Sequence, residues 1–180
     1  MSSKTFEDAI RAAQAAPTSG AKVEFLMNRP AEGKHVRVDE LYLDVTDGIH
    51  GDRWKDTAWL RLSDGSPDPR VQISLTNAGV MRCFTRGHPE GVYACGDNIY
   101  TDLNLTVERL RMGTRLQLGE AVIEISDVEN DACGKFAQRF GVDAFNCVRD
   151  DRYREFRLRG LFARVVISGL VKCGDQIVYV

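Results

Sequence analysis

Short stretches in which apolar and polar residues alternate recur along the chain from about residue 22 to its C-terminus. The clearest are 71–75 and the pair 114–118 and 121–128, which a Gly119-Glu120 turn separates. The stretch 36–45 alternates in two registers with a slip at Asp39-Glu40, which indicates a β-bulge. A period of two is typical of strands that bury one face, and a short link containing glycine joins such strands into a hairpin. Closing a sheet removes the unpaired edges of many antiparallel strands. The pattern therefore predicts a mostly β, barrel-like fold with a few short helices.

The N-terminal part of the chain has a different pattern. Phe6, Ile10 and Ala13 are spaced to share one face of a helix, and turn residues follow them. We expect an amphipathic helix within residues 1–20 that packs on a single β-barrel domain formed by residues 21–180. A chain of 180 residues is long enough for one such domain with a substantial core.

The composition excludes several classes of function. Lys and Arg total 24 and Asp and Glu total 26, so no overall positive charge attracts nucleic acid or an anionic membrane, and any anion site must be local. No apolar run is long enough to span a bilayer, and the start of the sequence contains acids and no apolar core, unlike a secretory signal. The five cysteines are well separated and contain no Cys-x-x-Cys pair. They predict neither a disulfide framework nor a zinc ribbon and favour a cytoplasmic protein.

Cys133 stands where a strand-like stretch passes into a short helix. Asp131 is placed to cap the N-terminus of this helix, and Gly141 is placed to end it. Free backbone amides and the helix dipole in a first turn favour a thiolate, as do basic side chains nearby. Two interpretations remain open: an accessible, reactive sulfur, or a small buried residue on the helical face of Phe136 and Phe140.

Residues 142–151 show no regular pattern and are expected to be irregular. Arginines are concentrated at the end of this stretch and just beyond it, namely Arg149, Arg152, Arg154, Arg157 and Arg159. A guanidinium group binds phosphate in a bidentate fork, and Arg157 and Arg159 would project from the same face of an extended segment. Together with Arg139, these two arginines are predicted to hold a small anionic ligand beside the sulfur of Cys133. The alternative is a solvated strand edge whose charges discourage aggregation.

Two polar loops, near residues 50 and 97, supply further candidates for pocket residues. Glycines in the first loop let the backbone approach a ligand, while neighbouring side chains supply polar contacts. The alternative for both loops is a turn whose side chains bond to their own backbone. The candidate pocket residues are His50, Asp52 and Arg53 in the first loop, Asp97 and Asn98 in the second, and Asn77, which is also placed to cap a helix running through Val80 and Met81 to Phe84.

The common hydrolase and nucleotide motifs are absent from the sequence. There is no Gly-x-Ser-x-Gly elbow, no His-Glu-x-x-His, no Walker loop and no Gly-x-Gly-x-x-Gly. A dyad of Cys133 with His50 or His88 remains open, because separation along the chain does not test it.

Taken together, these segments resemble the MOSC domain, which is named for the C-terminal domain of molybdenum cofactor sulfurases. The resemblance covers most of the chain and rests on the order of six segments: His50-Gly51-Asp52-Arg53, 71–78, Gly96-Asp97-Asn98, the helix with Cys133, Arg157-Leu158-Arg159-Gly160 and Gly174-Asp175. It implies a mostly β, barrel-like fold and a role in handling sulfur or the molybdenum cofactor, molybdopterin. On that pattern Cys133 matches the family's cysteine, which carries a persulfide or ligates molybdenum.

The chemistry of these residues suits either role. A thiolate is a soft metal ligand and also a nucleophile that can carry a second sulfur, and arginines suit the phosphate of the cofactor. Larger members of the family contain a pyridoxal-phosphate cysteine desulfurase domain or a ferredoxin-like cysteine cluster. The sequence contains neither, so the resemblance implies a separate protein as sulfur donor or electron donor.

Three hypotheses follow. The first is a stand-alone MOSC protein that binds the molybdenum cofactor or a related anionic ligand and uses Cys133 as a sulfur carrier or metal ligand, as a sulfurtransferase-like or molybdenum-cofactor-dependent enzyme. The second is a non-catalytic cofactor carrier or sensor that keeps the anion pocket. The third, which the family also suggests, is a molybdenum-dependent reductase of N-hydroxylated compounds. All three predict a small anionic ligand and no partnership with nucleic acid or membrane.

Overall fold

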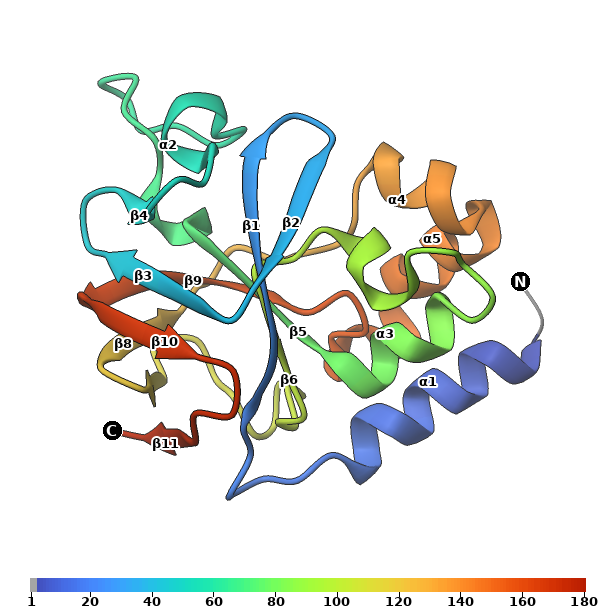
Figure 1. Cartoon of the computed structure of the whole chain (residues 1–180). Coiled ribbons are helices and arrows are strands. Elements are labelled where there is room, and N and C mark those ends of the chain that lie inside the picture. The colour runs from blue at the N-terminus through green and yellow to red at the C-terminus, as the bar shows by residue number, and fades with distance from the viewer. Residues whose placement is uncertain (1–2) are drawn as a thin grey trace.

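The computed structural model describes residues 3–180, which form two β-sheets on one side and a group of helices on the other (Figure 1). The larger sheet has eight strands in the order β11-β7-β8-β9-β5-β6-β1-β2. Its strands are β1 (Val23–Ala31), β2 (Lys34–Val38), β5 (Ile73–Asn77), β6 (Ile99–Thr101), β7 (Arg115–Leu118), β8 (Ala121–Ile125), β9 (Leu161–Ile167) and β11 (Ile177–Tyr179). The smaller sheet has the order β10-β3-β4 and contains β3 (Glu40–Asp44), β4 (Gly48–Ile49) and β10 (Gly169–Lys172).

The predicted β-rich fold is confirmed, but the larger sheet is not closed into a barrel, because β11 and β2 form its two free ends. The stretch 36–45, expected to be one strand with a bulge at Asp39-Glu40, divides there between the two sheets. Beyond Asp39, β3 pairs with β10 instead of continuing the pairing of β2 with β1. The chain therefore passes from the larger sheet to the smaller one at Asp39, and the larger sheet stays open.

The main core lies among the strands and explains the alternating pattern of the sequence. In the predicted hairpin β7–β8, Leu116 and Leu118 are buried while Arg115 and Gln117 are exposed. The same alternation in the other strands produces one apolar cluster fed by both sheets. Its removal from water supplies the main stabilisation of the fold.

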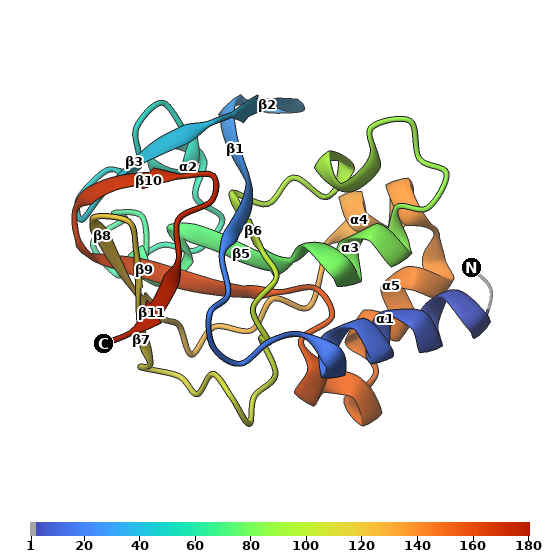
Figure 2. The same cartoon turned by 60° about the horizontal axis from the view of Figure 1, so that its bottom comes forward.

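The helices cover the other side of the larger sheet, where they form a second apolar cluster (Figure 2). They are α1 (Ser3–Ala15), α3 (Ala78–Phe84), α4 (Gly134–Phe140) and α5 (Val142–Arg149), with the single turn α2 (Trp54–Thr57) and the 3₁₀ turns η1 (Pro69–Val71), η2 (Gly91–Cys95) and η3 (Asp151–Phe156) standing between elements. In α1, Ala9 and Ala13 are buried, and Phe6 and Ile10 pack on the same cluster. Met1 and Ser2, which belong to the predicted N-terminal segment, lie outside the described residues.

Two predictions about the chain after α4 are wrong. Residues 142–151 were expected to be irregular, but most of them form α5, because Ala144, Phe145 and Val148 share a face that packs on the helical cluster. The segment before Arg157 is also not extended, since the carboxylate of Asp150 accepts a hydrogen bond from the backbone of Arg152 and starts η3. Arg157 and Arg159 therefore do not project from one face of an extended segment, as expected from the sequence.

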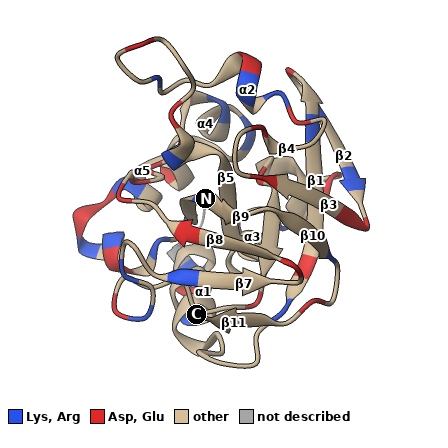
Figure 3. Ribbon diagram, turned by 90° about the vertical axis from the view of Figure 1, so that its left-hand side faces the viewer, with Lys and Arg blue, Asp and Glu red and all other residues tan. Residues whose placement is uncertain are grey.

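Basic and acidic residues are interspersed over the ribbon, in agreement with the near balance of charges in the sequence (Figure 3). Among the described residues, no helix has the length and apolar character needed to cross a membrane.

Candidate functional site

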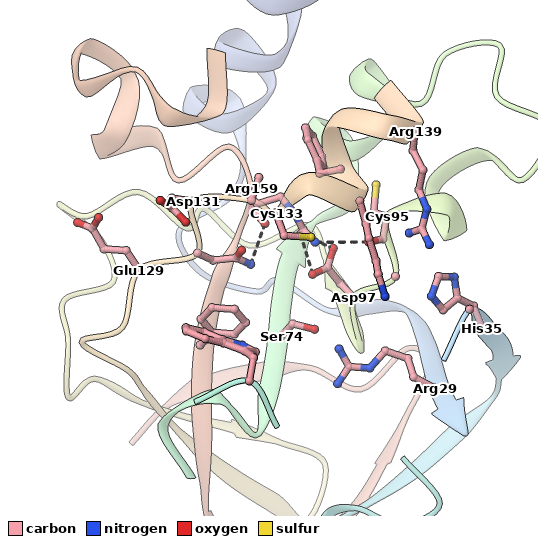
Figure 4. Close-up of a pocket in the computed structure, with 18 of the residues that line it drawn as sticks. Arg29, His35, Ser74, Cys95, Asp97, Glu129, Asp131, Cys133, Arg139 and Arg159 are labelled. Atoms are coloured by element: carbon pink, nitrogen blue, oxygen red, sulfur yellow. Dashed lines mark hydrogen bonds and ion pairs between the residues drawn. The ribbon is translucent and has the colours of Figure 1, made fainter. Parts of the chain in front are cut away.

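A cavity of about 320 Å³ lies where the larger sheet meets α4 and the loops around residues 53, 96 and 130. Strand β1 contributes Arg29, β5 contributes Ser74 and β9 contributes Phe162. Figure 4 shows Cys133 in this cavity, with Arg139, His35 and Arg29 on one side of it and Glu129 and Asp131 on the other. The other lining residues are Gly33, Arg53, Trp59, Cys95, Gly96, Asp97, Asn130, Ala132, Lys135, Phe136 and Arg159.

Cys133 is exposed and lines this cavity, so it is not the buried core residue that the sequence left open. It is the N-cap residue of α4, while Phe136 on the next turn is buried and Phe140 packs on the helical cluster. Ala132, just before it, has a φ of 67°, a left-handed conformation that few residues other than glycine adopt. The chain therefore turns sharply at Ala132, and the expected sulfur facing a pocket is present.

Asp131 does not cap this helix as expected. The helix begins at Gly134, no side chain accepts a hydrogen bond at its N-terminus, and the Asp131 carboxylate forms a salt bridge of 3.1 Å with Arg149 on α5. The turn at Ala132 separates Asp131 from the first amides of α4.

The other four cysteines have a different environment. Burial raises the pKa of the Cys83, Cys147 and Cys173 thiols, and it raises the pKa of Cys95, which also lines the cavity, to about 12. None of these four is as exposed as Cys133. Cys133 is therefore the most accessible of the five cysteines to a ligand or an electrophile.

Positive charge in the cavity is only partly neutralised. The carboxylate of Glu129 is paired with Arg154, and that of Asp131 with Arg149, both of which lie outside the cavity. Within residues 3–180, neither Arg53 nor Arg139 forms a salt bridge: Arg53 donates to the Thr57 hydroxyl and Arg139 to the carbonyl of Ala94. The cavity therefore contains two guanidinium groups available to an anion.

A buried ion pair lines the same cavity as Cys133. The Nη1 of Arg159 donates to both carboxylate oxygens of Asp97 at 2.7 and 2.6 Å, and the two side chains are only 11% and 1% exposed. Burial lowers the pKa of the Arg159 guanidinium, but the adjacent carboxylate more than offsets this and raises the pKa overall. The Nε of Arg159 is buried without a hydrogen-bond partner among the described residues.

A second buried network fixes Arg29. The carboxylate of Asp52 accepts from Arg29 Nε at 2.9 Å and from Asn98 Nδ2 at 3.0 Å. The Oδ1 of Asn98 in turn accepts from the backbone N–H and the hydroxyl of Ser74 at 3.1 and 3.0 Å. Strands β1 and β5 and the loop of Asp52 are thereby tied together behind the cavity.

His35 on β2 places an imidazole close to the backbone of Gly96. A Cβ atom at position 96 would lie 3.0 Å from the His35 ring, and Gly96 also has a φ of 76°, so glycine is required there on both grounds. Burial, together with the positive charges of Arg139 and Arg29, lowers the pKa of the imidazole from its usual 6.5. His35 is therefore neutral at pH 7 and can donate or accept a proton in a hydrogen bond.

A comparison with known families agrees with this arrangement. The family model of the MOSC domain matches residues 69–178, which include the Asp97 loop, Cys133, Arg139 and Arg159. The chain belongs to the MOSC family.

Solved structures show the same fold. This MOSC protein is similar to the YuaD protein from Bacillus subtilis, with a TM-score of 0.65 and 20% identity over 87% of this chain and 93% of that chain. It is also similar to YiiM from Escherichia coli, with a TM-score of 0.56 and 21% identity over 90% of this chain and 69% of that one. YiiM from Geobacillus stearothermophilus gives a TM-score of 0.58 and 16% identity over 89% and 75% of the two chains. No functionally curated protein matches the chain.

The structure divides the predicted site residues of this MOSC domain into three groups. Cys133, Arg53, Asp97, Arg139 and Arg159 line the cavity, and Asp52 and Asn98 support it from behind through Arg29 and Ser74. His50, Asn77 and Arg157 lie elsewhere. The functional roles predicted for these residues from the sequence stay predictions.

The third group has other contacts. His50 is exposed beside the Tyr42 ring and lines a different depression with Asp52, and Asn77 caps α3 by accepting from the backbone of Val80. Arg157, expected on the same face as Arg159, has a φ of 44° and donates to the carbonyls of Leu105 and Leu110. The Arg157 guanidinium is thus held by Leu105 and Leu110, whereas that of Arg159 is held by Asp97 in the Cys133 cavity. His88 packs near Phe140 outside the cavity, so neither histidine proposed as a partner of Cys133 lines it.

Several cavity residues were not among those predicted from the sequence, chiefly Arg29, His35, Trp59, Lys135 and Phe162. Arg29 and His35 lie in a β-hairpin whose local sequence carries no sign of a site. Trp59 stands in a turn-rich segment whose local sequence likewise does not distinguish a pocket residue from an ordinary exposed one.

Proposed function

We propose that this cavity binds an anionic ligand, the molybdenum cofactor or a related compound, and that the Cys133 thiolate carries sulfur to it or ligates its metal. The observation that carries the proposal is the exposed sulfur of Cys133 in a cavity where Arg53 and Arg139 have no carboxylate partner among the described residues. MOSC domains are associated in general with molybdenum-cofactor biology.

The donor set fits such a group. A thiolate is a soft ligand suited to a soft or redox-active metal, and the unpaired guanidinium groups and the partnerless Nε of Arg159 suit anionic oxygens. Among residues 3–180, no cluster of three or more His, Cys, Asp or Glu is arranged to hold a metal ion. Cys133 would therefore serve a metal that brings its own ligands. The bound cofactor would supply a redox-active metal centre, while this chain's residues bind and orient it.

Sulfur transfer requires a donor, which we propose to be a protein persulfide. The Cys133 thiolate attacks the outer sulfur of the donor persulfide, a new S–S bond forms at Cys133, the donor S–S bond breaks, and the donor leaves as a thiolate. No external oxidant or reductant is needed for this step. The open position of Cys133 permits the approach of such a donor, whereas the buried thiol of Cys95 does not.

Mass spectrometry of the protein mixed with a small persulfide donor tests this proposal. We expect one extra sulfur atom on the peptide of Cys133 and none on those of the other cysteines, and we expect iodoacetamide to modify Cys133 first, because burial raises the pKa of the other four thiols. Cys133→Ser should lose the extra sulfur, and Cys83→Ser is the matched control that should keep it. A persulfide spread equally over several cysteines would contradict the proposal.

Ligand affinity separates catalysis from a carrier role. If Cys133→Ser retains anion binding while sulfur transfer is lost, the sulfur acts chemically on a ligand that the arginines hold. If neither the anion nor sulfur is bound by the wild-type protein, the proposal fails as a whole.

A further inference from the structure

We infer that Trp59 and Phe162 form an aromatic wall in the Cys133 cavity and that this wall binds a flat heteroaromatic ring of the ligand. The inference rests on the proposed anion binding and adds the chemical class of the part of the ligand that carries no charge. Trp59 and Phe162 carry no charge, so the proposed binding of an anion gives neither of them a role.

Trp59 is displayed to solvent by a firmly held piece of chain. Its side chain is 66% exposed, whereas Ala58 before it is 8% exposed and Leu60 after it packs on a small apolar cluster with Trp54. The amide of Asp68 donates to the carbonyl of Leu60 at 3.0 Å, which ties down the loop that follows. The exposure of the indole is thus imposed by the fold on a fixed backbone.

Trp59 is not a lone exposed residue, because it and Phe162 both line the Cys133 cavity, and a ligand there would cover apolar surface of the indole that now faces water. Phe162 on β9 stands beside it, with ring centroids 6.1 Å apart and an angle of 49° between the ring planes. At this tilt the two rings are not stacked on each other. A face of each ring can therefore take a third, flat group.

The cavity separates two kinds of chemistry. Arg53 and Arg139 provide charge without carboxylate partners, Trp59 and Phe162 provide aromatic surface, and the same cavity contains Cys133. A simple inorganic anion would use only the first kind. An anion attached to a planar heteroaromatic ring uses both, since such rings stack on aromatic side chains and their polar edges accept hydrogen bonds. A cavity of about 320 Å³ is within the range of small-molecule sites.

Two sources can provide this chemistry: the pterin ring of a cofactor, or a purine-like ring of a nucleotide substrate. Calorimetric titration with 6-carboxypterin, adenosine 5′-monophosphate and ribose 5-phosphate distinguishes them, because the last has the phosphate and sugar without the base. We expect at least one ring-bearing anion to bind about tenfold more tightly than ribose 5-phosphate. Preference for the pterin assigns the wall to a cofactor, and preference for the nucleotide assigns it to a substrate.

Variants then locate the effect. Trp59→Ala should remove the advantage of the ring-bearing anion without weakening ribose 5-phosphate, and Trp59→Phe should restore most of it. Leu62→Ala is the matched control, because Leu62 is an exposed apolar residue near Trp59 that does not line the cavity. The ring-bearing probe should also quench tryptophan fluorescence in the wild-type protein and not in Trp59→Ala, since the remaining Trp54 is buried.

The outcomes are separable from failure of the proposed function. If all three probes bind equally and Trp59→Ala changes none of them, the aromatic wall is overturned while the anion site stands. If none of the three binds, the anion site fails and this inference fails with it. Loss of binding of ribose 5-phosphate in Trp59→Ala would also overturn the inference, because the indole would then support the whole cavity rather than a ring.

Discussion

The floor and the rim of the Cys133 cavity differ in whether their polar groups have partners within the protein. The floor consists of the buried groups Ser74, Asp97, Asn98 and Arg159 with the Arg29–Asp52 pair; the rim consists of Arg53, Trp59, Cys133 and Arg139. In the floor nearly every polar atom has a partner within the protein, whereas in the rim the charges and the sulfur have no ionic partner among the described residues.

Physical chemistry requires this difference. A buried charge or polar group without a partner is strongly destabilising, so the floor can exist only as a satisfied network. The rim is in contact with water, which solvates its charges at little cost until a ligand replaces the water. Substitutions in the floor should therefore change stability, and substitutions in the rim should change binding.

The largest expected effect is that of Asp97→Asn. It would leave the Arg159 guanidinium buried without its carboxylate, and removal of one partner from a buried ion pair lowers the free energy of unfolding by about 3–5 kcal/mol. Urea denaturation measures this change. Glu32→Gln is the control, because it removes the carboxylate of the exposed Lys135–Glu32 pair and should leave the urea midpoint unchanged. Equal effects of the two substitutions would remove the distinction between floor and rim.

Asn98→Ala should have the next largest effect. The amide of Asn98 bonds both Asp52 and Ser74, so its loss leaves buried groups unsatisfied on β5 and in the Asp52 loop and should lower the free energy of unfolding by about 1–3 kcal/mol. Leu62→Ala in the exposed loop provides the comparison. An Asn98→Ala protein as stable as the wild type would show that water replaces this network without loss.

Arg139→Gln should act on binding. We expect the affinity for ribose 5-phosphate to fall about tenfold, the loss typical of one charge-assisted hydrogen bond, while the urea midpoint stays close to that of the wild type. Arg157→Gln is a matched arginine outside the cavity and should leave the affinity unchanged. The wild-type affinity should weaken with added salt, and that of Arg139→Gln should weaken less.

The smallest effect is a pH dependence from His35. Because its pKa is lowered from 6.5, the imidazole is neutral at pH 7 and gains a proton only as the pH falls below that value. The added positive charge then strengthens anion binding, by about fivefold for a charge at contact distance in water. Sulfate is a suitable probe because its own charge is constant between pH 5 and 8. His35→Asn should flatten the profile, and a rise in affinity that survives this substitution would assign the effect to other groups.

Local patterns in the sequence predicted the strands and part of the rim. The β7–β8 hairpin, the Asn77 cap, the N-terminal amphipathic helix and the placement of Cys133 toward a pocket all depend on residues close together in the chain. Barrel closure was wrong because it depends on which strand β3 pairs with. The shared face of Arg157 and Arg159 was wrong because Arg157 itself is left-handed, so the segment is not extended, and its guanidinium bonds the carbonyls of Leu105 and Leu110 while that of Arg159 bonds Asp97.

The missing parts of the site have one physical cause. Arg29 and His35 reach the cavity through the pairing of β1 with β6 and β2 and through the bond of Asp52 to Asn98. Such contacts join segments far apart in the sequence, and neither segment has a local pattern of residues from which the contact could be predicted. The Arg159–Asp97 pair is of the same kind, although each residue was singled out separately.

The network that joins Arg29, Asp52, Asn98 and Ser74 also has a consequence for how the protein acquires its ligand. Its members come from β1, the loop after β4, the start of β6 and β5, so the cavity is assembled only when distant parts of the chain have found each other. Contacts of this kind form slowly, after loop-closure entropy has been overcome. A nascent or partly folded chain would therefore present the Cys133 thiol before the cavity around it exists, and binding of the proposed ligand should follow folding and raise the thermal midpoint of the finished protein.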